Sequence, residues 1–245
     1  MASSIRIGVV VFPGSNCDQD MVDALSVYPQ VEVVKLWHKS SDLQNVHMVV
    51  LPGGFSYGDY LRSGAIARFS PIMNEVIRFA SSGGYVLGVC NGFQILCESH
   101  LLPGALLHNN SHSFICENVF LKTGSSASPM TKSLASADVF QIPIAHGEGK
   151  YFTDADSLKK LQDNGQILFR YCSKDGVLAN EFNPNGAIDH IAGICNDKMN
   201  VFGMMPHPER AANPILGNTD GRIILNGFLQ KLFSEVLEPD YNVSI

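Results

Sequence analysis

Hydrophobic residues change their spacing in a regular way over the first hundred positions. A continuous apolar run rich in β-branched residues occurs at 5–12, and shorter strand-like segments occur at 31–36, 47–51 and 85–89. Such runs are typical of strands that are covered on both faces. Residues 17–28, 70–81 and 91–99, which lie between or after these runs, have helical character. This alternation predicts right-handed crossovers and a parallel sheet with helices on both faces.

The pattern changes in the middle of the chain, where strand-like segments follow one another without a helix. Residues 115–122 and 139–145 have this character and predict an antiparallel excursion. A helix is expected at 153–165, with Thr153 as its N-cap and Gly165 as its stop.

The remaining segments complete one domain. Late strands are expected at 167–171, 187–195 and 201–205, a closing helix at 220–237, and loose order over the last eight residues. Because no linker interrupts the pattern, we expect a single domain over 1–245. Its fold class is α/β, with a mostly parallel, flavodoxin-like sheet, helices on both faces and a smaller antiparallel excursion.

Charge and cysteine content narrow the class of protein. Seventeen Lys and Arg against 23 Asp and Glu give a net charge of −6, which argues against a general nucleic-acid binder. No apolar run approaches the roughly 18 residues of a membrane span, and the start lacks the features of a signal peptide. We therefore expect a cytoplasmic protein without a nucleic-acid or membrane partner. The six cysteines contain no C-x-x-C pair, so most are expected to be small buried groups, Cys97 among them.

The sharpest chemical feature is the sequence Gly88-Val89-Cys90-Asn91-Gly92, between an apolar strand and a helical pattern. It has the spacing of a nucleophile elbow with cysteine as the nucleophile. The flanking glycines remove side chains that would block a tight strand-to-helix turn, and the helix N-terminus favours negative charge on the sulfur. The backbone N–H of Asn91 is placed to stabilise an oxyanion.

A thiol nucleophile needs a base and a group that orients the base, and two H-x-E segments offer both. His207 and Glu209 follow a predicted strand, and Pro208 between them stiffens the pair. Residues i and i+2 of an extended segment project to the same side, so the two can hydrogen-bond. His146 and Glu148 lie among flexible glycines and remain the rival pair. We favour His207 and Glu209.

Three further segments have possible chemistry. The sequence LPGGFSYGD follows the third strand, and its paired glycines, Gly53 and Gly54, could supply a second oxyanion donor. Cys17, in FPGSNCD, is a rival nucleophile without the flanking glycine pattern. His108 and His112 have metal-ligand spacing, but HNNSHS is a poor helix sequence, so we interpret them as surface or wall residues.

These motifs together give the chain a resemblance to the class I glutamine amidotransferases. FPGSNCD, PGGFSYGD, GVCNGFQ, PIAHGEGKY, NPNG and MMPHPER make it similar to the small, free-standing glutaminase subunits of phosphoribosylformylglycinamidine synthase. The resemblance extends over nearly the whole length. It implies a catalytic triad of Cys90, His207 and Glu209.

The resemblance also implies how the substrate and partners are handled. Gly54 and Asn91 match the oxyanion-hole positions, and Gln94 matches a residue that helps hold the substrate, L-glutamine. By analogy, His146 and Glu148 line the glutamine pocket or a subunit interface. Ammonia would pass to an ATP-binding synthetase subunit, assembled with a small bridging subunit, that makes formylglycinamidine ribonucleotide for purine biosynthesis.

No cofactor is expected in this chain. The complete reaction would use ATP and Mg²⁺ on the partner subunit. The sequence has neither a G-x-x-x-x-G-K-[ST] motif nor a G-x-G-x-x-G after a strand, which fits this division.

Two other functions are compatible with the elbow. A thiol hydrolase of the same architecture would act on esters or thioesters and need no partner. A regulatory module could sense a ligand or oxidant through Cys90, although this leaves His207 and Glu209 without a role.

Overall fold

A computed structural model describes residues 4–134 and 139–237. The prediction of loose order for the last eight residues falls on 238–245 and lies outside the described residues.

Nine strands form one sheet, and two short strands form a second sheet. The strands of the large sheet are β1 (Ile5–Val11), β2 (Val31–Trp37), β3 (Met48–Leu51), β4 (Tyr85–Val89), β6 (Ile115–Thr123), β7 (Val139–His146), β9 (Ile167–Cys172), β10 (Ile191–Cys195) and β11 (Val201–Met204). The small sheet pairs β5 (Ala105–Leu107) with β8 (Lys150–Phe152) in antiparallel register.

The large sheet has a parallel part and an antiparallel part. Its order is β2-β1-β3-β4-β11-β10-β9-β6-β7. Neighbours from β2 to β11 are parallel, and those from β11 to β7 are antiparallel. The predicted α/β fold class is confirmed, and the antiparallel excursion continues the same sheet.

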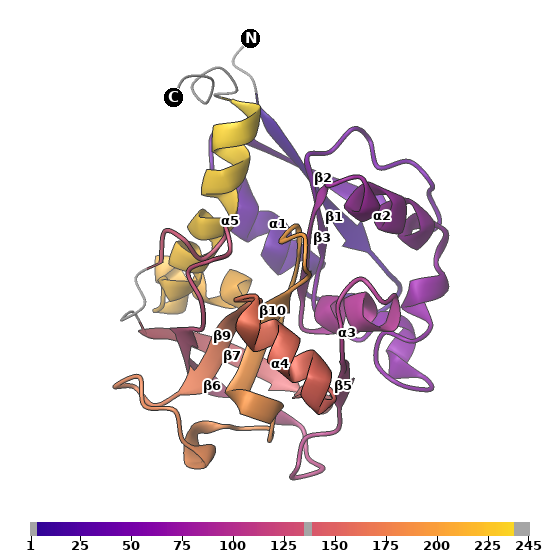
Figure 1. Cartoon of the computed structure of the whole chain (residues 1–245). Coiled ribbons are helices and arrows are strands. Elements are labelled where there is room, and N and C mark those ends of the chain that lie inside the picture. Colours follow the sequence, from indigo (N-terminus) through magenta and orange to yellow (C-terminus); the bar gives the residue numbers. More distant parts are fainter. Residues whose placement is uncertain (1–3, 135–138, 238–245) are drawn as a thin grey trace.

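Helices cover both faces of the parallel part (Figure 1). They are α1 (Asp18–Ser26), α2 (Pro71–Ser81), α3 (Asn91–Glu98) and α5 (Asp220–Val236). The remaining helix, α4 (Ala155–Asp163), lies by the antiparallel part instead. α1 and α5 contact β1 and the 3-10 turn η5 (Pro208–Ala211), whereas α2 and α3 contact β4. In Figure 1, α2 and α3 lie to the right of the parallel strands. The strands between these layers are buried, as their continuous apolar runs predict.

Two local predictions are wrong. Thr153 does not cap α4; the N-cap is Asp154, whose carboxylate accepts a hydrogen bond from the Ser157 N–H at 2.9 Å. The strand predicted at 187–195 begins only at Ile191, because residues 188–190 form a 3-10 turn with Asp189 at φ +50°. Gly165 follows α4 at φ +65°, as expected for a helix stop.

None of the helices within 4–134 and 139–237 combines the length and apolar character needed to cross a membrane.

Candidate active site

Cys90 lies at the point where β4 ends and α3 begins. Its backbone has φ +50° and ψ −105°, a conformation that is strained for a residue with a side chain. The Cys90 N–H donates to the Met204 carbonyl at 2.8 Å, at the end of the neighbouring strand β11. The strained turn predicted for the elbow is therefore present, fixed between two parallel strands.

The glycines of the elbow are required by close backbone contacts. A Cβ at Gly88 would lie 2.6 Å from the Gly92 carbonyl carbon, and a Cβ at Gly92 would overlap the Leu51 carbonyl oxygen. Neither neighbour is a flexible side chain that could move. The sequence argument for glycine at both positions holds.

His207 and Glu209 form a buried pair after β11. His207 Nδ1 and Glu209 Oε1 are 2.6 Å apart, and the two residues are 1% and 3% exposed. Because β11 is the neighbour of β4, the pair lies at the same edge of the sheet as Cys90. Pro208 begins η5 directly between the two side chains. His207 Nε2 has no hydrogen-bond partner among the described residues and is left available to the thiol.

The charge state of His207 is set by its neighbours. Burial alone would lower the pKa of the imidazole. The Glu209 carboxylate and the Cys90 sulfur raise this pKa by more than burial lowers it, so the net pKa lies well above the ordinary value. Cys90 and His207 follow the ends of the neighbouring strands β4 and β11. The Cys90 Sγ also lies 3.7 Å from the Ala145 carbonyl oxygen of β7. Such an environment favours the protonated, imidazolium form of His207.

The rival pair is not assembled. The buried His146 ring contacts Asn109, with Nδ1 and Oδ1 3.1 Å apart, and burial, together with His207, lowers the His146 pKa to about 4. Glu148 instead accepts from the Ser63 N–H at 3.1 Å and faces His108. His146 is thus a neutral wall residue near the site rather than a base oriented by Glu148.

The loop after β3 lies against the elbow. A Cβ at Gly53 would lie 2.6 Å from His207 Cε1, so only glycine lets the ring approach. Gly54 has φ +130°, and a Cβ there would meet the Asn16 nitrogen at 2.6 Å. Gly54 lines a cavity of about 150 Å³ together with His207; its role as an oxyanion donor stays a prediction.

The Asn91 side chain ties this loop to α3. Its Oδ1 accepts from the Ser56 N–H at 3.2 Å, and its Nδ2 donates to Gln94 Oε1 at 2.9 Å and to Asp59 Oδ1 at 3.3 Å. Gln94 in turn donates to the Glu148 carbonyl at 2.7 Å. Asn91 and Gln94, two of the three predicted substrate-binding residues, therefore belong to one hydrogen-bonded network.

Cys17 also lies close to His207, with its Sγ within 4.8 Å of an imidazole nitrogen. It is buried, and Arg210 donates to its Sγ at 3.0 Å while also bonding Asp20 at 3.1 Å. Arg210 was not identified from the sequence, although its position directly after His-Pro-Glu was a usable signal. Cys17, Gly54, Phe114 and His207 help line a cavity of about 150 Å³.

His108 and His112 lie away from the buried site. Their ring centroids are 6.2 Å apart, and both residues are exposed. Both line a surface pocket that also includes Glu148. The interpretation as surface or wall residues agrees with this placement.

Comparison with known proteins places this architecture in a class. A family model described as "CobB/CobQ-like glutamine amidotransferase domain" matches residues 4–236. The glutaminase domain of Trypanosoma brucei CTPS, solved with bound acivicin, has a TM-score of 0.59 over 93% of this chain and 94% of that chain, and at 10% identity it shares the fold alone. Fold and site together define a glutamine amidotransferase.

Relatives at higher identity narrow the class. Phosphoribosylformylglycinamidine synthase subunit PurQ of Moorella thermoacetica is 55% identical over 221 residues, covering 90% of this chain and 94% of that protein. The Salinibacter ruber subunit is 50% identical over 226 residues, covering 92% and 96%. In the structure of PurLQS from Thermotoga maritima, one chain is 39% identical, with a TM-score of 0.82 over 94% of this chain and 99% of that chain. The chain belongs to the family of phosphoribosylformylglycinamidine synthase PurQ subunits.

Proposed function

We propose that this chain is a glutaminase that supplies ammonia to a synthetase subunit. It hydrolyses L-glutamine to glutamate and ammonia through a thioester on Cys90. The observation that carries the proposal is the placement of a strained cysteine and a buried His–Glu pair at the ends of adjacent strands, β4 and β11. The family relationship supports the same activity.

In the proposed mechanism each residue of the site has a role. The Cys90 thiolate attacks the side-chain amide carbon of glutamine, and the N–H groups of Gly54 and Asn91 stabilise the oxyanion, each by about 3 kcal/mol. His207, oriented by Glu209, gives a proton to the departing ammonia as the C–N bond breaks. The same imidazole then takes a proton from the water that hydrolyses the thioester and releases glutamate. Gln94 helps to position the substrate.

The ammonia serves a C–N ligase reaction on a partner subunit. That synthetase converts formylglycinamide ribonucleotide to formylglycinamidine ribonucleotide in purine biosynthesis, with ATP and Mg²⁺ bound on the partner. We further propose a small bridging subunit in the complex, a cytoplasmic location, and one glutaminase domain over 1–245. The relatives named as synthase subunits support this assignment.

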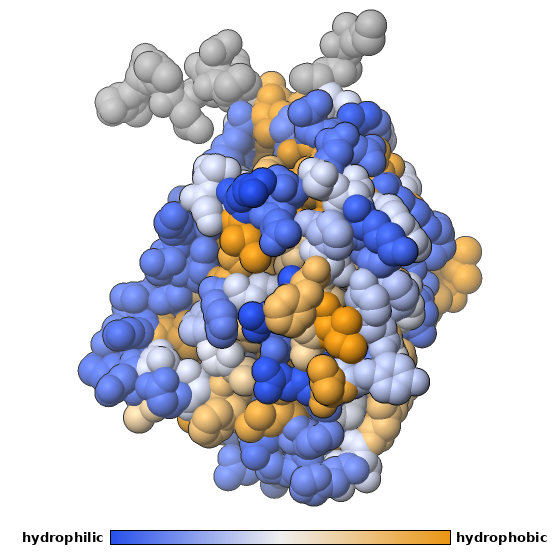
Figure 2. Space-filling model, turned by 90° about the vertical axis from the view of Figure 1, so that its right-hand side faces the viewer, coloured by the Kyte–Doolittle hydropathy of each residue, from blue (hydrophilic) through white to orange (hydrophobic). Residues whose placement is uncertain are grey.

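The surface near the site fits a chain that works as a subunit. Tyr60, Leu61 and Phe69, between β3 and α2, are exposed apolar residues, and Leu61 is 92% exposed. Figure 2 shows apolar groups gathered in the middle of a largely hydrophilic face, on the side of the molecule that carries α2 and α3. Exposed apolar patches with a polar rim are typical of protein contacts.

The test is a Cys90→Ala variant assembled with the matching synthetase. Glutamine-dependent synthesis should fall by about 10³-fold or more, because the nucleophile is lost. Synthesis from added ammonium should continue, since the synthetase is intact. Cys116→Ala, which alters an exposed thiol, is the matched control and should leave both activities unchanged. Full glutamine use by Cys90→Ala would refute the proposal.

A further inference from the structure

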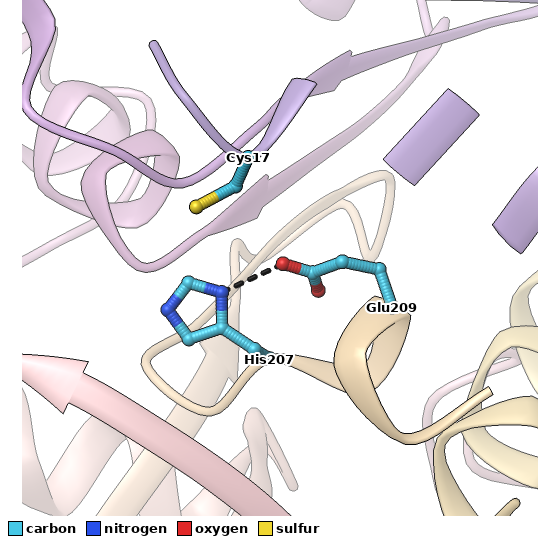
Figure 3. Close-up of side chains that lie close together, drawn as sticks. All are labelled: Cys17, His207 and Glu209. Atoms are coloured by element: carbon cyan, nitrogen blue, oxygen red, sulfur yellow. Dashed lines mark hydrogen bonds and ion pairs between the residues drawn. The ribbon is translucent and has the colours of Figure 1, made fainter. Parts of the chain in front are cut away.

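Cys17, His207 and Glu209 converge on one point, although Cys17 is distant from the other two in the chain. Cys17 precedes α1, whereas His207 and Glu209 follow β11. All three are buried, and one potential ligand atom from each lies within 4.8 Å of the others (Figure 3). A thiol, an imidazole and a carboxylate are the three ligand types that Zn²⁺ takes in proteins.

The sulfur lies on one side of the imidazole. A Cβ built at Gly53 would meet His207 Cε1 at 2.6 Å, His207 Nδ1 at 3.2 Å and Cys17 Sγ at 3.3 Å, so all three border the same point. Figure 3 shows the sulfur facing the ring while Glu209 approaches Nδ1 from the side. Glu209 Oε2 is buried without a hydrogen-bond partner among the described residues, which leaves a carboxylate oxygen free for another ligand.

We propose that Cys17, His207 and Glu209 form an inhibitory site for a thiophilic divalent cation such as Zn²⁺. Ligand bonds of about 2.0 to 2.3 Å place the atoms of a tetrahedral shell about 3 to 4 Å apart. Shifts of about 1 Å therefore bring the present side chains into ligand positions. The Cys17 thiol releases its proton to solvent on binding.

The surroundings leave room for the exchange. Cys17 and His207 border the cavity of about 150 Å³, which gives a cation an approach. Arg210 must give up its hydrogen bond to Cys17 Sγ, and its contact with Asp20 retains the guanidinium beside the site.

Inhibition follows from the tautomer of the imidazole, and this step rests on the proposed function. A cation on Nδ1 displaces the proton shared with Glu209, and that proton leaves to solvent. The ring is then fixed as a neutral imidazole with its single proton on Nε2. In this form the nitrogen that faces Cys90 cannot accept a proton, and the neutral ring is a weaker acid than an imidazolium toward the departing ammonia, so acid–base exchange at His207 is blocked.

Binding is tested without activity by adding Co²⁺ to the full-length Cys90→Ala protein. Cys17 should give a thiolate-to-Co²⁺ charge-transfer band at one equivalent of Co²⁺. The band should be absent from the double variant that carries Cys17→Ser as well as Cys90→Ala. A band that survives Cys17→Ser, or no band in Cys90→Ala, overturns the site.

A second measurement needs no change at Cys17. Zn²⁺ should protect Cys17 from alkylation in the Cys90→Ala protein, as read by mass spectrometry, while exposed Cys116 stays reactive. Equal alkylation of Cys17 with and without Zn²⁺ also overturns it.

Inhibition is tested on the assembled enzyme. Zn²⁺ should reduce glutamine hydrolysis, and a chelator should restore it. Cys17→Ser, compared with its own metal-free rate, should raise the Zn²⁺ concentration for half inhibition by about tenfold or more, since a ligand is lost. An unchanged concentration would place the metal on Cys90 and refute the proposal. Failure of the glutaminase assignment is distinct, because it would appear as absent hydrolysis in the metal-free protein.

Discussion

At the scale of single residues, the site depends on glycines, which have no side chain, as much as on the residues that carry functional groups. Gly92 permits the turn at Cys90, and Gly53 permits the approach of His207 to the same edge. These glycines differ from those in open turns, because fixed atoms occupy the space where their Cβ would lie. The reactive groups are therefore positioned by close backbone packing.

Gly92→Ala should destabilise the fold by about 1 to 3 kcal/mol, because the new methyl group meets the Leu51 carbonyl oxygen. Chemical denaturation of the purified chain measures the loss. Gly147→Ala is the control, since the nearest atom to its Cβ is 4.0 Å away, and it should change stability by less than about 0.5 kcal/mol. Equal effects of the two substitutions would contradict the packing argument.

Glu209→Gln should lower the free energy of unfolding most at low pH. The pKa of His207 is raised in the folded state, despite burial, by Glu209 and Cys90. Its stabilising contribution is therefore fully present below the ordinary histidine pKa of about 6.5 and is lost as pH rises through the folded-state pKa.

The expected cost of Glu209→Gln is about 3 kcal/mol at pH 6, shrinking toward alkaline pH. Denaturant titrations across this range measure it. Glu32→Gln, at an exposed pair with Arg6, is the control and should change stability far less, because solvent and salt screen this pair. A Glu209→Gln cost that grows with pH would show that His207 is neutral in the fold.

At the scale of elements, the loop after β3 and the first turn of α3 act together. Asn91 is the first residue of α3, and its side chain holds the backbone of Ser56 and the side chain of Asp59. Burial raises the pKa of Asp59 to about 6, with a smaller contribution from the charge of Glu148, while hydrogen bonds from Ser63 and Asn91 oppose the rise. The loop that carries Gly54 is thus fixed by the residue next to the nucleophile.

Asn91→Ala should reduce kcat for glutamine hydrolysis by about tenfold or more while KM changes less, because the oxyanion loop loses its support. Steady-state kinetics of the assembled enzyme test this. The Ser56 N–H and Gln94 Oε1 also lose partners, so stability should fall by about 1 to 3 kcal/mol. Asn118→Ala, at an exposed position of β6, is the control and should leave both constants unchanged. Equal changes of kcat and KM in the Asn91→Ala and Asn118→Ala variants would contradict the role of Asn91.

The sequence predicted elements well where one pattern dominated. The buried runs at 5–12, 47–51 and 85–89 correspond to β1, β3 and β4. The start of α4 was misplaced because either Thr153 or Asp154 can cap a helix, and only the structure shows which side chain accepts the hydrogen bond. The strand at 187–195 was predicted too long because Ala187 and Ile188 precede the apolar run from Ile191, and the polar Asp189 and His190 between them form the turn.

The active site was predictable to the extent that its residues are neighbours in sequence. The elbow and the His207–Glu209 pair are local motifs, and their assignment as catalytic stays a prediction. The contact between Cys17 and Arg210 joins residues 193 positions apart, so no local pattern could reveal it. The partner of His146, Asn109, is hidden for the same reason.

At the scale of the whole molecule, the last helix is joined to the far edge of the sheet. The Gln141 N–H of β7 donates to Asp220 Oδ2 at 2.8 Å, and Asn218 donates to the Gln141 carbonyl at 2.6 Å. β7 is the terminal strand of the large sheet, and these contacts satisfy backbone groups that would otherwise be unpaired.

Asp220→Ala should lower the free energy of unfolding by about 1 to 3 kcal/mol, since it leaves the Gln141 N–H without its acceptor. Thermal and denaturant unfolding measure the effect. Asp156→Ala, at an exposed position in the first turn of α4, should change stability by about 0.5 kcal/mol or less. An equally large loss of stability in Asp156→Ala would contradict the argument that the hydrogen bond between Asp220 and Gln141 stabilises the fold.

β11 is the last strand along the described chain, yet it lies in the interior of the large sheet, between β4 and β10. In the proposed mechanism, a growing polypeptide that has emerged only as far as β10 holds the Cys90 sulfur but lacks the imidazole that would activate it. The proposed activity then appears late in biosynthesis, once β11 has been inserted between β4 and β10 and His207 follows it. On this mechanism, ammonia is not released before most of the chain has been made.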